Sequence, residues 1–97
     1  MDKTKEIYLG KHLLVGLTYL NEDESVREKI QLHGTIVAVS DNTIRFVRAD
    51  NGEKFSIPFD EDNILEAETG AVYKLKSTGE HVVHVDYLSH WIIHPPE

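Results

Sequence analysis

The 97-residue sequence contains no cysteine and no long apolar run. The absence of cysteine excludes disulfides, thiolate metal sites and a cysteine nucleophile. Small secreted domains are often held together by disulfides, so we expect a cytoplasmic protein. No apolar run approaches the roughly 18 residues of a membrane-spanning helix. Residues 1–6 are polar, so we expect neither a signal peptide nor attachment to a membrane.

Positive charge is also scarce. The sequence has 10 lysine and arginine residues against 17 aspartate and glutamate residues, and its formal net charge is −7. Proteins bind nucleic acids chiefly by placing cationic side chains against phosphates, so we do not expect nucleic acid as a partner. An acidic surface suits a basic protein partner instead.

Length and composition predict one small domain over residues 1–97, with flexible ends at 1–6 and 95–97. Domains typically have about 100–150 residues, so the chain is too short for two separate cores. Apolar residues make up 40% of the sequence and charged residues 28%, which is close to the composition of folded proteins. A domain of this size has a thin core, so self-association would add stability.

The first half of the sequence alternates between apolar and polar residues, as strands with one buried face do. This pattern predicts a strand over Leu13–Tyr19 and a solvated loop over Asn21–Ser25. A long second strand follows over Ile30–Val39. Its apolar residues change parity, and Gly34 lies where a bulge or bend would let the strand change its inward face.

Turn residues divide the next segment into a pair of strands. Asp41-Asn42 predicts a tight turn, and a third strand follows over Ile44–Val47. Asn51-Gly52 then predicts a hairpin with a type I′ turn, because both residues tolerate the positive φ angles that this turn requires. The return strand covers Lys54–Phe59, and its Pro58 favours a sheet edge, where no backbone N–H is needed.

The second half predicts further strands and one short helical turn. The acidic segment Asp60–Glu68 is too short and too weakly periodic for a long helix, so we expect a single turn there and a solvated surface. Strands are predicted over Ala71–Lys76 and over Val82–Ile93. The predicted fold class is therefore all-β, a five- to six-stranded antiparallel and partly open barrel.

A family resemblance appears in this strand pattern. The segment Leu32–Phe46, a bent strand through a glycine followed by an acidic turn and an amphipathic strand, resembles the first motif of Sm-like folds and also suits SH3-like barrels. The segments Gly10–Leu20 and Lys76–Glu80 resemble those of small bacterial proteins without assigned function. The resemblance implies the barrel fold, and it implies nucleic-acid binding only as an alternative function.

Four of the six histidines fall near the C-terminus, and they define an alternative metal site. His90 and His94 would lie about 13 Å apart on one strand, too far to share a metal ion. His84 and His90 could be paired across a hairpin, with Asp86 as a carboxylate ligand. The predicted metal ligands are His84, Asp86, His90 and His94. Histidines on a solvent-facing strand are the other interpretation, and no cofactor is expected from the rest of the sequence.

The sequence favours a non-enzymatic protein-interaction module. Ser89, His90 and Asp86 are the residue types of a hydrolase triad, but neighbouring strand residues face opposite sides, which argues against it. If the odd-numbered residues of Leu13–Tyr19 fill the core, several apolar side chains face outward and need a cover. A second copy or another protein would supply it, or the same chain buries both faces. The predicted contact residues are Leu14, Tyr19, Leu20 and Trp91.

Overall fold

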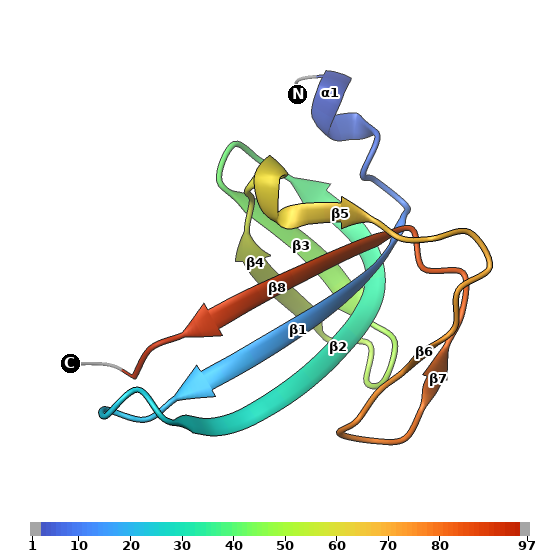
Figure 1. Cartoon of the computed structure of the whole chain (residues 1–97). Helices are drawn as coiled ribbons and strands as arrows, with labels where there is room; N and C mark the ends of the chain where they lie inside the picture. The colour runs from blue at the N-terminus through green and yellow to red at the C-terminus, as the bar shows by residue number, and fades with distance from the viewer. Residues whose placement is uncertain (1–2, 96–97) are drawn as a thin grey trace.

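The computed structural model describes residues 3–95 and has the predicted all-β architecture (Figure 1). The elements in chain order are α1 (Lys3–Glu6), β1 (His12–Leu20), β2 (Val26–Val39), β3 (Thr43–Arg48), β4 (Lys54–Pro58), η1 (Glu61–Asn63), β5 (Ile64–Glu66), β6 (Tyr73–Lys74), β7 (His81–Val82) and β8 (Tyr87–Ile93). Two short helical turns are present, α1 and the 3₁₀ turn η1, where the sequence predicted at most one. Residues 3–6 form the single turn of α1. Of the flexible ends predicted at 1–6 and 95–97, residues 1–2 and 96–97 lie outside the described residues, and the flexibility of the ends stays a prediction. Among the described residues, no helix is long and apolar enough to cross a membrane.

Six strands form one sheet in the order β4-β3-β2-β1-β8-β5, and β6 pairs only with β7. The two end strands, β4 and β5, are not paired with each other, so the sheet stays open. The prediction of antiparallel pairing throughout is wrong in one place, because β8 runs parallel to β1. A parallel pair needs a long connection. The β6–β7 hairpin lies within the connection that brings the chain back into β8.

Strand β2 is long and bent, as predicted, but its bulge lies elsewhere. The register between β2 and β3 shifts between Ile36 and Ala38, so Val37 is the extra residue, and its side chain is exposed. The shift lets both Ile36 and Val39 face the core. Gly34 has another role. A Cβ atom there would lie 1.9 Å from the Val47 carbonyl oxygen, so the two backbones approach too closely for any side chain.

The predicted hairpin at Asn51-Gly52 joins β3 to β4, but its turn differs from the predicted type. A type I′ turn needs positive φ at both central residues. Here only Gly52 has a positive φ, 73°, whereas Asn51 does not. The loop is closed by the Gly52 N–H, which donates to the Arg48 carbonyl at 2.9 Å, and by the Arg48 N–H, which donates to the Glu53 carbonyl at 2.8 Å.

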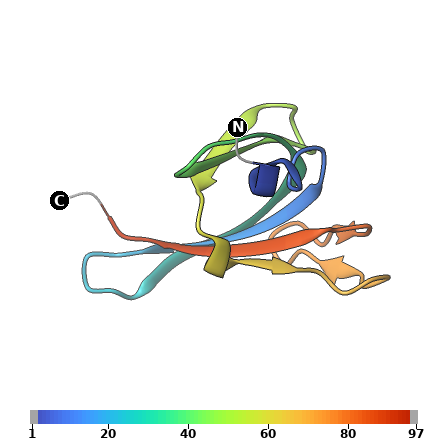
Figure 2. The ribbon, with the colours of Figure 1, turned by 90° about the horizontal axis from the view of Figure 1, so that it is seen from above.

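The main core fills the concave side of the curled sheet. Figure 2 shows the β3–β4 hairpin arching over the layer that contains β1 and β8. Side chains from β1 to β4 meet in the space between, and the buried members are Tyr8, Leu13, Val15, Leu17, Leu32, Ile36, Val39, Ile44, Phe46 and Ile57. Tyr8, just after α1, packs edge-on against Phe59 and Tyr87. Burial raises the pKa of the Tyr8 phenol, and the nearby Glu61 carboxylate adds to this effect.

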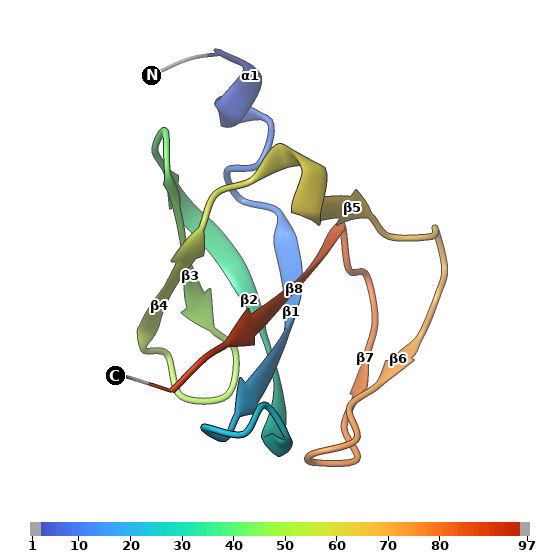
Figure 3. The same ribbon diagram turned by 60° about the vertical axis from the view of Figure 1, so that its left-hand side comes forward.

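A second, smaller core lies on the other side of β1, beneath the β6–β7 hairpin. Figure 3 shows this hairpin and the β3–β4 hairpin on opposite sides of β1. The buried members of the second core are Leu14, Leu75, Val82 and Val85. Strand β1 is therefore buried on both faces, and the chain itself covers the outward face of Leu14.

The predicted strand over Val82–Ile93 is divided into β7 and β8. His84, between them, has a φ of 58°, in the left-handed region that side chains other than glycine seldom adopt. This residue breaks the strand and turns the chain toward β1. Sequence periodicity does not reveal such a break, because the residues on both sides remain β-branched or aromatic.

Candidate functional site

The open side of the sheet carries an apolar groove between β4 and the second half of β8. We call it the open-side groove. Its volume is about 310 Å³, and its walls come from Leu17, residues 55–58 and residues 91–94. Most of these side chains are apolar or aromatic, as in pockets that bind ligands and peptides. The groove lies beside two strand edges that have no neighbouring strand within residues 3–95, the whole outer edge of β4 and the last part of β8.

The first free edge is that of β4, the end strand of the sheet. The Phe59 N–H donates to the Asn42 carbonyl at 3.0 Å, so the backbone groups of odd-numbered residues here point toward β3. Backbone direction alternates along a strand, so the N–H and C=O groups of Lys54 and Ser56 point away from the sheet. Pro58 has no N–H to offer. A further strand could therefore pair with β4 through Lys54 and Ser56.

The second free edge is the end of β8. On the β5 side, the Asp86 carbonyl accepts from the Ala67 N–H at 3.0 Å, and the His90 carbonyl accepts from the Asn63 side chain at 2.7 Å. Pairing with β5 ends at Ser89. Backbone direction alternates along β8 as well, so the N–H and C=O groups of Ile92 point to the side on which β5 has already ended. The Ile92 side chain is itself 55% exposed.

Trp91, a predicted contact residue, lies in the wall of the open-side groove. Its ring packs against the main core, and its indole nitrogen Nε1 is buried with no hydrogen-bond partner among the described residues. A buried donor without a partner is unfavourable, because it has lost its bonds to water. The hydroxyl of Ser89, on the same face of β8, is also buried with no hydrogen-bond partner among residues 3–95.

The other predicted contact residues are placed differently. Leu14 is only 6% exposed and belongs to the second core. Tyr19 is partly buried against the main core, and the Arg27 guanidinium lies 5.6 Å from its ring centre. Leu20, at the end of β1, is partly exposed. The four residues therefore do not form one surface, and only Trp91 lines the groove.

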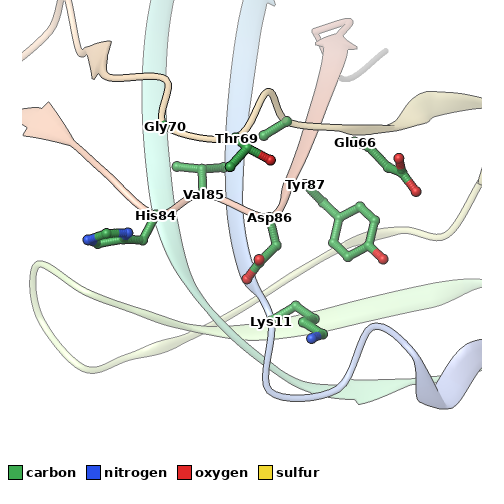
Figure 4. A pocket seen from close by; sticks show the side chains of 9 residues that line it. Lys11, Glu66, Thr69, Gly70, His84, Val85, Asp86 and Tyr87 are labelled. Atoms are coloured by element: carbon green, nitrogen blue, oxygen red, sulfur yellow. The ribbon is translucent and has the colours of Figure 1, made fainter.

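The predicted metal ligands are not brought together. Figure 4 shows the polar depression that is lined by His84 and Asp86. The Asp86 carboxylate points toward Lys11, whereas the His84 ring points away from Lys11. Asp86 accepts the His12 backbone N–H at 2.9 Å, so it anchors the start of β1. His90 bonds the Thr18 hydroxyl at 2.9 Å, and His94 lines the open-side groove. Over residues 3–95, no group of three or more histidine, aspartate or glutamate residues could hold a metal ion.

The structure instead joins two histidines that the sequence analysis did not single out. His12 Nε2 and His33 Nδ1 are 2.9 Å apart. At one end of this pair, His12 Nδ1 lies 3.2 Å from the His84 carbonyl oxygen. At the other end, His33 Nε2 lies 3.1 Å from a carboxylate oxygen of Glu80. The chain of bonds links β1 and β2 to both ends of β7.

Counting protons shows which charge state completes this chain. Both end acceptors are oxygens, so His12 Nδ1 and His33 Nε2 must each carry a proton, and a third proton must lie between the rings. Two neutral imidazoles have only two protons. All three bonds therefore form when the pair carries one positive charge, opposite the Glu80 carboxylate. A fourth proton would place two N–H groups against each other and break the central bond.

The histidine pair predicts a mutational effect on the β6–β7 hairpin. In His33→Ala, hydrogen-exchange protection of the hairpin amides should fall by about tenfold, because the bonds from His33 to His12 and to Glu80 are lost. The matched control is His81→Ala, since His81 is exposed on the same hairpin. Equal protection of the hairpin in the two variants would contradict a role of the pair in holding it.

Comparison of the chain with protein-family models, with curated proteins and with solved structures finds no match. Function must therefore be argued from the site. Two features stand out in residues 3–95: an apolar groove beside free strand edges, and a hydrogen-bonded histidine pair. The pair ties the chain's own elements together, whereas the groove faces outward. The groove is the candidate functional site.

Proposed function

We propose that this protein is a non-enzymatic protein-interaction module that binds an extended segment of a partner at the open-side groove. The observation that carries the proposal is the position of an apolar groove beside the unpaired edge of β4. An added strand would satisfy the outward backbone groups of Lys54 and Ser56, and its alternate side chains would enter the groove. Main-chain bonds supply affinity in this mode of recognition, and the pockets supply specificity.

The exposed edge of β4 and the apolar groove beside it favour a bound partner. An exposed strand edge beside an apolar groove is a site of unwanted pairing unless it is covered or blocked. Pro58 limits pairing at one end of β4, but Lys54 and Ser56 leave their outward N–H and C=O groups open. The groove also contains the aromatic rings of Phe55 and Trp91. Aromatic anchors of this kind dominate the binding energy of many interfaces.

A proline substitution tests the proposal. Ser56→Pro removes the outward N–H and leaves the pairing of β4 with β3 intact, because that pairing uses the neighbouring residues. We expect a partner that wild-type protein retains from a lysate of its own cells to be lost with Ser56→Pro. The control is Ser56→Ala, which also removes the hydroxyl that accepts from Arg45 at 3.4 Å but keeps the N–H.

The comparison of these variants decides the outcome. Circular dichroism first establishes that both variants fold. Loss of the same partner from Ser56→Pro, but not from Ser56→Ala, would support edge pairing. Retention of identical proteins by wild type and both variants would reject it.

The relation to SH3-like and Sm-like barrels, and with it a bacterial cytoplasmic origin, is part of this proposal. It is supported by the consecutive pairing of β1 to β4 and by the strong bend of β2. Nucleic-acid binding by analogy with Sm-like folds is not supported by any basic surface at the groove. Lys54 is the only lysine or arginine of β4.

A further inference from the structure

We propose that the segment bound at the open-side groove is basic, with lysine or arginine alternating with apolar residues. This inference rests on the proposed function and names the chemistry of its partner. It follows from where the acidic loops of this chain lie relative to the groove.

One acidic loop lies at the first end of the groove. Pro58 lines the groove, and the chain continues from it into Asp60, Glu61 and Asp62, whose side chains are all exposed. The same turn is held to β8, because the Asn63 side chain donates to the His90 carbonyl at 2.7 Å. The three carboxylates are therefore fixed beside the point where β8 loses its neighbour β5.

A second acidic loop follows the end of β1, and β1 ends beside the other end of the groove wall. Ile93, in the groove wall, is the register partner of Tyr19 near the end of β1. The loop that follows β1 carries Glu22, Asp23 and Glu24, and all three are exposed. A strand lying along the groove would thus have the carboxylates after β4 near one end, and beyond the other end the three carboxylates of this loop, with the single Arg27 guanidinium against Tyr19.

These charges select the partner. Its side chains on one face would enter the apolar groove, while those on the other face point toward solvent and toward the acidic loops. A basic segment would be attracted by the carboxylates near its two ends, and an acidic one would be repelled by them. The net charge of −7 extends this preference to the approach of the partner, since long-range attraction raises the rate of association.

Two matched peptides test the inference. One capped peptide alternates lysine with valine, and the other alternates glutamate with valine. The chain contains a single tryptophan, Trp91 in the groove wall, so its fluorescence reports binding directly. At low salt we expect the lysine peptide to bind at least about tenfold more tightly than the glutamate peptide, and added salt should reduce this difference.

Variants locate the charge effect. Glu61→Gln should weaken binding of the lysine peptide, whereas Glu68→Gln should not. The two substitutions change the net charge equally, but Glu68 follows β5 on the side of the second core and is not at the groove. Ser56→Pro should abolish binding of either peptide.

The possible results distinguish a failure of the charge preference from a failure of the proposed strand pairing. If both peptides bind equally and Ser56→Pro abolishes both, the groove pairs with strands but does not select charge, and the inference is overturned. If neither peptide alters the fluorescence of Trp91 at any salt concentration, edge pairing itself is rejected. If the lysine peptide binds preferentially but Glu61→Gln and Glu68→Gln behave alike, only the overall charge acts, and the loops have no selective role.

Discussion

Gly34→Ala is expected to prevent folding or to destabilise the protein by at least about 4 kcal/mol. The added Cβ would lie 1.9 Å from the Val47 carbonyl oxygen and 2.7 Å from its carbon. Both are backbone atoms of the paired strand β3, so relief requires β2 and β3 to separate at this point. Urea denaturation, followed by circular dichroism, measures the change in the free energy of unfolding.

Gly16→Ala is the matched control for this prediction. A Cβ at Gly16 would lie 3.0 Å from the His90 ring, which is a side chain and can move. The same chemical change in the same sheet should therefore cost about 1 kcal/mol or less. Equal losses in the two variants would show that the close approach of β2 and β3 at Gly34 does not limit stability.

Leu75→Ala is expected to have the second largest effect, a loss of about 2–5 kcal/mol. Leu75 is 1% exposed and fills the centre of the small second core. Without it, the β6–β7 hairpin should loosen from the sheet and expose Leu14. Amide exchange should then quicken in the hairpin more than in β2 and β3, and the protein should self-associate at high concentration, as sedimentation would detect.

The control for the hairpin is Val72→Ala. Val72 precedes the same strand but is 57% exposed, so its truncation should change stability by no more than about 0.5 kcal/mol. If Val72→Ala and Leu75→Ala loosen the hairpin equally, its attachment depends on something other than the second core.

Sequence reasoning worked best where structure depends on neighbouring residues. The strands from Leu13 to Phe59 were predicted because each alternates in polarity and each is followed by turn residues. The pairing of β8 was beyond this reasoning. Its partner β1 comes from the opposite end of the chain, and no local pattern shows that two distant strands run parallel. That the β6–β7 hairpin covers Leu14 of β1 was not predicted either, because this contact also joins distant parts of the chain.

The histidine pair depends on a shift of one residue in the register between β1 and β2. Leu20 is paired with Val26 beside the loop, and continuing that register would place His12 opposite Gly34. The structure has a register shift between Tyr19 and Leu20, so His12 is opposite Thr35, and His33 is opposite Leu14. The shift puts His12 and His33 on the same face as diagonal neighbours. The pair could have been found only by anticipating this bulge.

The sequence did not predict the open-side groove. Trp91 was among the predicted contact residues, and it lies in the groove wall, but the contact itself is still a prediction. The groove itself depends on where β5 stops and β8 continues, and strand ends of this kind are set by tertiary pairing. The prediction that a sheet edge would serve as the contact remains a prediction.

The parallel pairing of β1 with β8 also has a consequence for the order of events during synthesis. Strand β1 is made early, but its second neighbour is made only after β2 to β7. Until then the edge of β1 that will pair with β8 is open to water and to other chains. Folding that depends on such distant contacts is slow. The newly made chain therefore has a period in which β1 is its most exposed aggregation site, although β1 is the most completely buried strand of the finished protein.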